Sequence, residues 1–143
     1  MVELDFVKGY LYGIIGVLYE VHRELGPGLN EKVYQEGVML EMESSNIPFK
    51  RELSFHPSYK GIVMKADFRL DFLVDDNVIL ELKSVSSITE EHRAQLFNYM
   101  RLCKPIAGIL VNFANKSCEI ERYIFDRDLC MILNVNGVPV SRK

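Results

Sequence analysis

The sequence has little of several features that define particular classes of protein. Its three cysteines, Cys103, Cys118 and Cys130, are odd in number and form no CxxC pair, which favours buried thiols in a reduced, intracellular protein over a disulfide framework. The apolar run Leu11–Tyr19 is too short to cross a bilayer and follows acidic rather than basic residues, so we expect neither a membrane span nor a secretory signal. These absences predict a cytoplasmic location.

A basic excess is missing as well. The formal net charge is −3, which argues against a broad surface that coats nucleic acid, because such surfaces are normally basic. This charge does not exclude a compact active site that handles a phosphodiester through a metal ion. The sequence also contains no P-loop, no GxGxxG, no zinc-type His/Cys spacing and no Ser-His-Asp arrangement.

No low-complexity stretch or linker divides the chain. With 143 residues, of which 48% are hydrophobic, it is expected to form one domain, residues 1–143, with a substantial core. Periodicity and capping signals predict helices over residues 4–25, 30–44 and 87–102, the last beginning at a Ser87-x-x-Glu90 capping box. Apolar segments predict strands over residues 47–59 (broken near His56-Pro57), 62–74, 78–83, 106–113 and 119–125, the last taken as the final strand of the sheet. This order predicts an α/β fold in which helices cover a mixed central sheet.

The most informative segment places charged residues inside two apolar strands. Alternation puts Glu81 and Lys83 on one face of their strand and its apolar residues on the other. If residues 75–77 form a three-residue loop, Asp71 lies directly opposite Glu81, with the Cβ atoms roughly 5 Å apart. A two-residue loop would instead turn Asp71 to the other face. Two carboxylates that close repel unless a cation or a proton lies between them, so the three-residue loop predicts a divalent cation site beside a lysine, suited to a phosphate.

Further motifs extend this pattern along the chain. They are Val21–Pro27, Gly28-Leu29-Asn30-Glu31-Lys32-Val33-Tyr34, Arg69-Leu70-Asp71, Glu81-Leu82-Lys83, Gln95-Leu96-Phe97-Asn98-Tyr99 and Val111-Asn112-Phe113. In order and spacing over about residues 5–125, these segments resemble the GxxExxY family of small bacterial and archaeal proteins. That family is similar to the PD-(D/E)xK nuclease superfamily, which has an αβββαβ core of the restriction-endonuclease type. Gln95-x-x-x-Tyr99, on the helix after the lysine strand, resembles the RecB-like branch.

The resemblance implies a metal site. Asp71 and Glu81 would be the direct ligands, and the backbone carbonyl of Leu82 is a candidate third ligand. Glu31 would complete the acidic cluster, through water or by holding a second ion. The cation expected is Mg²⁺ or Mn²⁺, because Mg²⁺ is bound by one or two carboxylates while it keeps several waters.

The resemblance also implies catalytic roles. Lys83 would be the catalytic lysine, either as a base toward water or as a charge that stabilises the transition state. Glu31, Gln95 and Tyr99 would contribute to the site from their helices. The function implied is a metal-dependent nuclease that hydrolyses phosphodiester bonds in nucleic acid, with DNA favoured over RNA. Because the chain is small and acidic, we expect a homodimer or a partner protein to help hold the substrate.

Each feature also has a simpler interpretation. Glu31 would be favourable at a helix N-terminus without any other role. Tyr34 is best interpreted as a packing residue with its hydroxyl satisfied, whereas His92, one turn before Gln95, could approach a substrate. The basic residues Lys50, Arg51, Lys60, Lys65, Arg69, Arg93, Arg101 and Lys104 are candidate phosphate contacts, although scattered charges are usually only surface.

Two other functions remain open at this stage. The first is a catalytically silent interaction module or regulatory subunit that keeps the PD-(D/E)xK fold. The second is hydrolysis of a nucleotide or another small phosphate ester. The fold alone cannot separate these from a nuclease, because one fold serves many functions.

Overall fold

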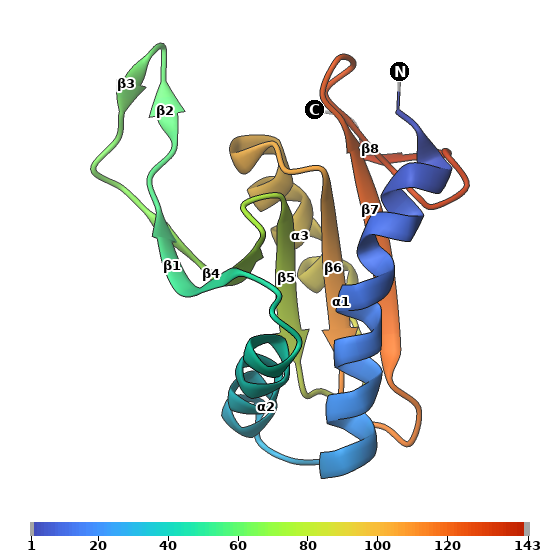
Figure 1. Cartoon of the computed structure of the whole chain (residues 1–143). Coiled ribbons are helices and arrows are strands. Elements are labelled where there is room, and N and C mark those ends of the chain that lie inside the picture. The colour runs from blue at the N-terminus through green and yellow to red at the C-terminus, as the bar shows by residue number, and fades with distance from the viewer. Residues whose placement is uncertain (1, 142–143) are drawn as a thin grey trace.

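The computed structural model describes residues 2–141, which form three helices and nine strands (Figure 1). The elements in chain order are α1 (Leu4–Leu25), α2 (Glu31–Ser44), β1 (Phe49–Phe55), β2 (Ser58–Tyr59), β3 (Ile62–Val63), β4 (Phe68–Val74), β5 (Val78–Lys83), α3 (Glu90–Cys103), β6 (Ala107–Asn112), β7 (Glu119–Asp126), β8 (Met131–Leu133) and β9 (Pro139–Ser141). No helix in this described range is long and apolar enough to cross a membrane.

Seven of the strands form one mixed sheet in the order β1-β4-β5-β6-β7-β8-β9. Strands β5 and β6 are parallel and are connected through α3, while all other neighbours in this sheet are antiparallel. Helices α1 and α2 lie against one face and α3 lies against the other (Figure 1). The predicted α/β fold, with a mixed central sheet flanked by helices, is confirmed.

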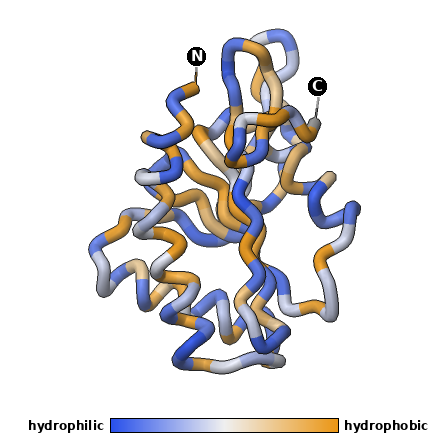
Figure 2. The backbone as a smooth tube through the Cα atoms, turned by 90° about the vertical axis from the view of Figure 1, so that its right-hand side faces the viewer, coloured by the Kyte–Doolittle hydropathy of each residue, from blue (hydrophilic) through white to orange (hydrophobic). Residues whose placement is uncertain are grey.

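The sheet separates two hydrophobic clusters. On the α1 and α2 side, Leu11 and Tyr34 pack with Leu80 and the other buried residues of the larger cluster. On the α3 side, Leu96 packs in the smaller cluster with Ile79. Successive residues of β5 therefore point to opposite clusters, as the alternation of a strand requires. Figure 2 shows the hydrophobic stretches of the backbone concentrated in the central strands.

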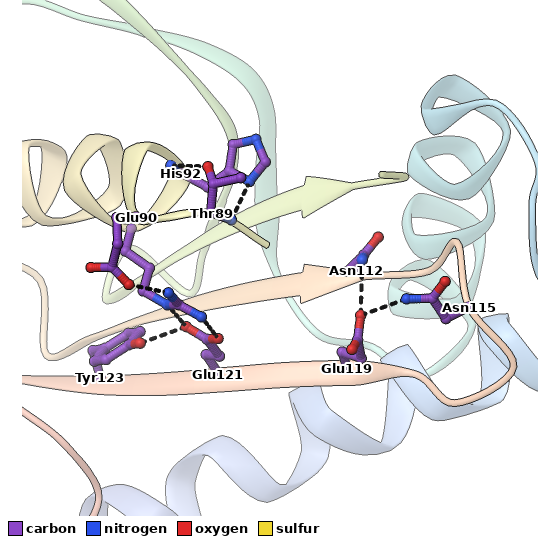
Figure 3. A network of polar contacts seen from close by, with 9 residues as sticks. Thr89, Glu90, His92, Asn112, Asn115, Glu119, Glu121 and Tyr123 are labelled. Carbon is purple, nitrogen blue, oxygen red and sulfur yellow. Dashed lines mark hydrogen bonds and ion pairs between the residues drawn. The ribbon is translucent and has the colours of Figure 1, made fainter. Parts of the chain in front are cut away.

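Local capping explains where the helices begin and end. The Asn30 side chain accepts a hydrogen bond from the Lys32 N–H at 2.9 Å and caps α2, as the sequence predicts. Helix α3 begins later than the predicted Ser87 capping box. Its cap is Thr89, whose hydroxyl accepts from the His92 N–H, while the His92 imidazole accepts from the Thr89 N–H (Figure 3). The prediction was wrong because it considered only a carboxylate in the return bond, which an imidazole nitrogen also makes.

Two strand predictions are also corrected. The predicted strand over residues 62–74 is split into β3 and β4, and β3 pairs with β2 in a separate two-stranded sheet. Strand β7 is followed by β8 and β9, so it is not the last strand of the main sheet. Both added strands are only three residues long, which is too short for a reliable alternation signal.

Candidate functional site

The β4–β5 hairpin has the three-residue loop on which the site hypothesis depends. Val74 pairs with Val78, and the register continues to Phe72 opposite Leu80. The loop residues Asp75 and Asp76 both have positive φ, and Tyr10 of α1 donates a hydrogen bond to the Asp75 carboxylate at 2.5 Å. The paired register ends there, and Asp71 and Glu81 follow on the two strands, where each side chain accepts a hydrogen bond from a backbone N–H of the other strand.

The carboxylates of Asp71 and Glu81 are held by the backbone of the opposite strand. The Asp71 N–H donates to Oε2 of Glu81 at 2.8 Å, and the Leu82 N–H donates to Oδ2 of Asp71 at 2.9 Å. Each carboxylate thus takes the place of a backbone carbonyl in the ladder between the strands. Glu81 is largely withdrawn from water, with 6% of its surface exposed, whereas Asp71 is half-buried.

This arrangement is electrostatically unfavourable without a cation. Burial, and then the negative charge of Asp71, raises the pKa of the Glu81 carboxyl well above its ordinary value. The bond from the Asp71 N–H and the positive charge of Lys83 offset only part of this increase. Among the residues that the structure describes, Lys83 forms no direct ion pair. The pair therefore remains without a neutralising partner at contact distance.

Glu31 lies at the first position of α2, within electrostatic range of the pair. Burial, followed by the charge of Asp71, raises the pKa of Glu31, whereas the charge of Lys83 lowers it. Glu31 does not form a compact cluster with the other two acids. Within residues 2–141, no group of three His, Cys, Asp or Glu side chains is gathered closely enough to hold one ion.

The loop before Glu31 is fixed by two hydroxyl groups. The Tyr34 hydroxyl donates to the Gly26 carbonyl at 2.6 Å and accepts from the Leu29 N–H at 3.0 Å. Ser84, directly after β5, donates to the Leu29 carbonyl at 2.5 Å and ties this loop to the end of the lysine strand. Tyr34 is fully buried, which confirms its interpretation as a packing residue with a satisfied hydroxyl.

Helix α3 brings Tyr99 and Gln95 to the other side of the pair. Burial, and then the charges of Glu81 and Asp71, raises the pKa of the Tyr99 phenol, whereas a hydrogen bond with Gln95 lowers it. The Tyr99 ring stacks on Phe68 of β4, with ring centroids 4.4 Å apart. Tyr99 thus lies within electrostatic range of both carboxylates, and Gln95 reaches them through its hydrogen bond with Tyr99. His92, in contrast, is occupied as a helix cap.

Asn112 is a site residue to which the sequence interpretation gave no role. It is fully buried at the end of β6, where the parallel register pairs it with Lys83. Its Oδ1 accepts from the Val85 N–H at 3.0 Å, and its Nδ2 donates to the Val85 carbonyl at 2.8 Å. The same Nδ2 donates to Glu119 at 2.9 Å (Figure 3). Asn112 therefore fixes the chain two residues after Lys83. A lone amide ending an otherwise apolar strand was the available signal.

A second polar network, on α3 and β7, is built as an ion pair. Arg93 donates twice to Glu121, at 2.7 Å for each bond, and Tyr123 donates to the same carboxylate at 2.5 Å (Figure 3). The bonds from Arg93 lower the pKa of Glu121. Arg93 is thus engaged within the protein, which leaves it poorly placed to contact phosphate.

The donors around Asp71 and Glu81 suit a hard divalent cation. Two carboxylates, with the Leu82 backbone carbonyl between Glu81 and Lys83, supply the oxygen ligands that Mg²⁺ and Mn²⁺ prefer. A cation would also relieve the repulsion that raises the pKa of Glu81. The residues present therefore fit such an ion, with Glu31 outside the direct ligand set.

Comparisons with known proteins agree with this fold. A family model described as the PD-(D/E)XK nuclease superfamily matches residues 8–123, a range that includes all the residues proposed for the site. The chain is also similar to a solved structure described as "Crystal structure of SSO0001", with a TM-score of 0.50 and 20% identity over 64% of this chain. The match spans about half of that protein, 48% of its chain, and shows the fold alone. No curated protein matches the sequence.

Proposed function

This chain belongs to the PD-(D/E)XK nuclease superfamily, and on that premise we propose that it is a metal-dependent nuclease that hydrolyses phosphodiester bonds in DNA. The observation that carries the proposal is the Asp71–Glu81 pair. A buried carboxylate beside a second carboxylate is costly for the folded protein unless a cation or a proton neutralises the pair. Lys83, on the same strand as Glu81, supplies the free positive charge that a phosphate substrate needs.

Within the superfamily, we assign the chain to the GxxExxY family and the RecB-like branch. Supporting this assignment, Glu31 lies within electrostatic range of Lys83, and Tyr34 bonds the loop that Ser84 ties to the end of β5. Gln95 and Tyr99 approach the carboxylates from α3, the helix that follows the lysine strand.

Asp71, Glu81 and the Leu82 carbonyl would hold Mg²⁺ or Mn²⁺. When bound, such a cation lowers the pKa of a bound water and neutralises charge on the phosphate. Lys83 would stabilise the negative charge that develops on the phosphoryl oxygens or orient the attacking water. Glu31 would act through its negative charge at the edge of the site.

The α3 residues would orient the substrate. Tyr99 presents its phenol beside the two acids, and Gln95, exposed and bonded to that phenol, adds an amide donor. The homodimer or partner protein that we expect stays a prediction, and sedimentation of the purified chain tests the homodimer. The cytoplasmic location also stays a prediction.

The test is a cleavage assay on single-stranded, double-stranded and branched DNA, and on RNA, with magnesium or manganese. We expect wild-type protein to cut DNA only with the cation, and Lys83→Ala to lower the rate by about 100-fold or more, as for the loss of one electrostatic group. Lys32→Ala is the matched control, because Lys32 is an exposed lysine one residue from Glu31. Cleavage that is equal in Lys83→Ala would identify a contaminating nuclease. No cleavage of any polymer by the wild type would favour a silent interaction module.

A further inference from the structure

The segment between β1 and β4 forms a separate projection, residues 56–67, which we call the arm. Strands β2 and β3 pair within it, with Tyr59 opposite Ile62. The two-residue turn is Lys60-Gly61, both with positive φ, as a tight hairpin requires. Figure 1 shows the arm extending beyond the β1 edge of the sheet and away from the helices.

The arm packs little against the rest of the protein, although Asp67 at its base accepts a hydrogen bond from Ser54 of β1. Every residue from 58 to 67 is exposed, including Tyr59 at 62%, Ile62 at 71% and Val63 at 67%. An isolated two-stranded hairpin is only marginally stable in water, and a group of exposed apolar side chains usually marks a contact surface. The arm therefore has the character of a binding element whose partner lies outside the chain.

The arm, together with the strand residues on either side of it, has a charge opposite to that of the remainder, and within the arm itself the charged residues are Lys60, Lys65 and Asp67. Residues 50–69 contain five basic and two acidic side chains, while the other 123 residues contain twelve basic and eighteen acidic ones. Lys60, Lys65 and Arg69 form no ion pair with any residue that the structure describes. Lys60 instead lies over the Tyr59 ring, with its Nζ 5.5 Å from the ring centroid. This local excess of free cations matches a polyanion.

The base of the arm borders the candidate site. Phe68, the first residue after the arm, stacks on Tyr99. The phenol of Tyr99 lies within electrostatic range of Glu81 and Asp71. Lys65 is six residues before Asp71 on the same chain, so it lies within about 20 Å of that acid at 3.3 Å per extended residue. A DNA duplex carries one negative charge per about 1.7 Å of its axis. A duplex held at the acids therefore presents many phosphate charges within the distance that separates Asp71 from Lys65.

We propose that the arm binds the backbone of the DNA duplex on which the site acts, with Lys60 and Lys65 contacting phosphates and Tyr59 and Ile62 contacting a groove. This inference rests on the proposed function, since it gives the nuclease its means of holding a polymer despite a net acidic chain. A second copy of the chain is the less favoured occupant, because pairing two arms would bring four lysines together.

The experiment measures binding of a short fluorescein-labelled DNA duplex in chelator, by fluorescence anisotropy over a series of salt concentrations. The test variant is Lys60→Gln with Lys65→Gln. The control is Lys32→Gln with Lys116→Gln, which removes the same charge from two exposed lysines outside the arm. We expect the test variant to bind more weakly and to reduce the slope of log Kd against log salt by about 2, since each lost phosphate contact reduces it by about 0.9. The control should keep the wild-type slope.

Equal slopes and affinities in the two double variants, or no binding of the duplex by wild type, would overturn the proposal. Cleavage with magnesium is measured on the same proteins to separate the two proposals. Arm-dependent binding without cleavage by any protein supports the arm and contradicts the nuclease. Cleavage and binding that are unchanged by the arm substitutions contradict the arm and leave the nuclease standing. If Tyr59→Ser with Ile62→Ser turns a dimer into a monomer while the lysine variant binds DNA like its control, the arm is a protein interface and the proposal fails.

Discussion

Glu81 is nearly buried and faces a second carboxylate, so its ionised form is unfavourable in the metal-free protein. Burial raises the pKa of Glu81 most, and the negative charge of Asp71 raises it further. A bound cation would neutralise the effect of Asp71 but not the effect of burial. A residue in this position is explained by binding chemistry more readily than by stability, because functional residues are not optimised for stability.

The first prediction at this scale concerns Glu81→Gln. In chelator, we expect the variant to be as stable as wild type or more stable by about 1 kcal/mol, because the amide oxygen can still accept from the Asp71 N–H while the repulsion is lost. Added magnesium should raise the melting temperature of wild type by mass action and leave that of the variant unchanged. Thermal melts of both proteins, with magnesium and with chelator, test this. A clear loss of stability of the variant in chelator would contradict a metal site.

The pH dependence of the same group gives a second prediction. Because the folded state raises the pKa of Glu81, its contribution to stability is fully present below the ordinary glutamate pKa and is lost as pH rises through the raised value. In chelator, the free energy of unfolding of wild type should therefore fall relative to Glu81→Gln as pH increases toward neutrality. Urea unfolding of both proteins at several pH values measures the difference. A difference that does not change with pH would show that Glu81 titrates normally.

Among the elements, the α1–α2 connection is held by Tyr34 from within α2 and by Ser84 from the end of β5. The Tyr34 hydroxyl satisfies both Gly26 and Leu29, and its ring stacks on Phe113 with centroids 4.5 Å apart. This connection directly precedes Glu31, so its geometry decides where that acid lies.

A third prediction follows for Tyr34→Phe. The substitution keeps the ring but leaves the Leu29 N–H and the Gly26 carbonyl without their partner, which should cost about 1–3 kcal/mol of unfolding free energy. Tyr12→Phe is the control, because Tyr12 is 80% exposed and its hydroxyl makes no hydrogen bond with any residue that the structure describes. Urea denaturation compares both variants with wild type. Equal stability of the two variants would mean that the hydroxyl does not hold the connection.

The sequence predicts elements well where a local signal decides them. Asn30 begins α2 because its side chain satisfies a helix N–H, and the β4–β5 register follows from the loop of residues 75–77. Prediction from the sequence fails where an element depends on a residue distant in the chain, or on a residue type that rarely plays that role. The imidazole of His92 replaces the expected carboxylate at the start of α3, and β8 and β9 exist only because β7 offers them an edge.

The whole molecule brings together residues from four elements around one pair of acids. The closeness of Asp71 and Glu81 could be predicted, since the three-residue loop and the register up to Phe72–Leu80 bring these positions together. The sequence could not predict the hydrogen bonds from backbone N–H groups to both carboxylates, or those between Asn112 and Val85. These bonds depend on the spacing between strands, which only the packed sheet defines.

Magnesium binding is the measurement that tests the central claim most directly. Calorimetric titration of the wild type should show binding at millimolar or tighter concentration, and Asp71→Asn should abolish it, because one of two direct carboxylate ligands loses its charge. Asp76→Asn is the control, since Asp76 is an exposed acid in the turn of the same hairpin. It should bind magnesium like the wild type. No binding by wild type, or equal binding by wild type and Asp71→Asn, would contradict the metal site and the nuclease built on it.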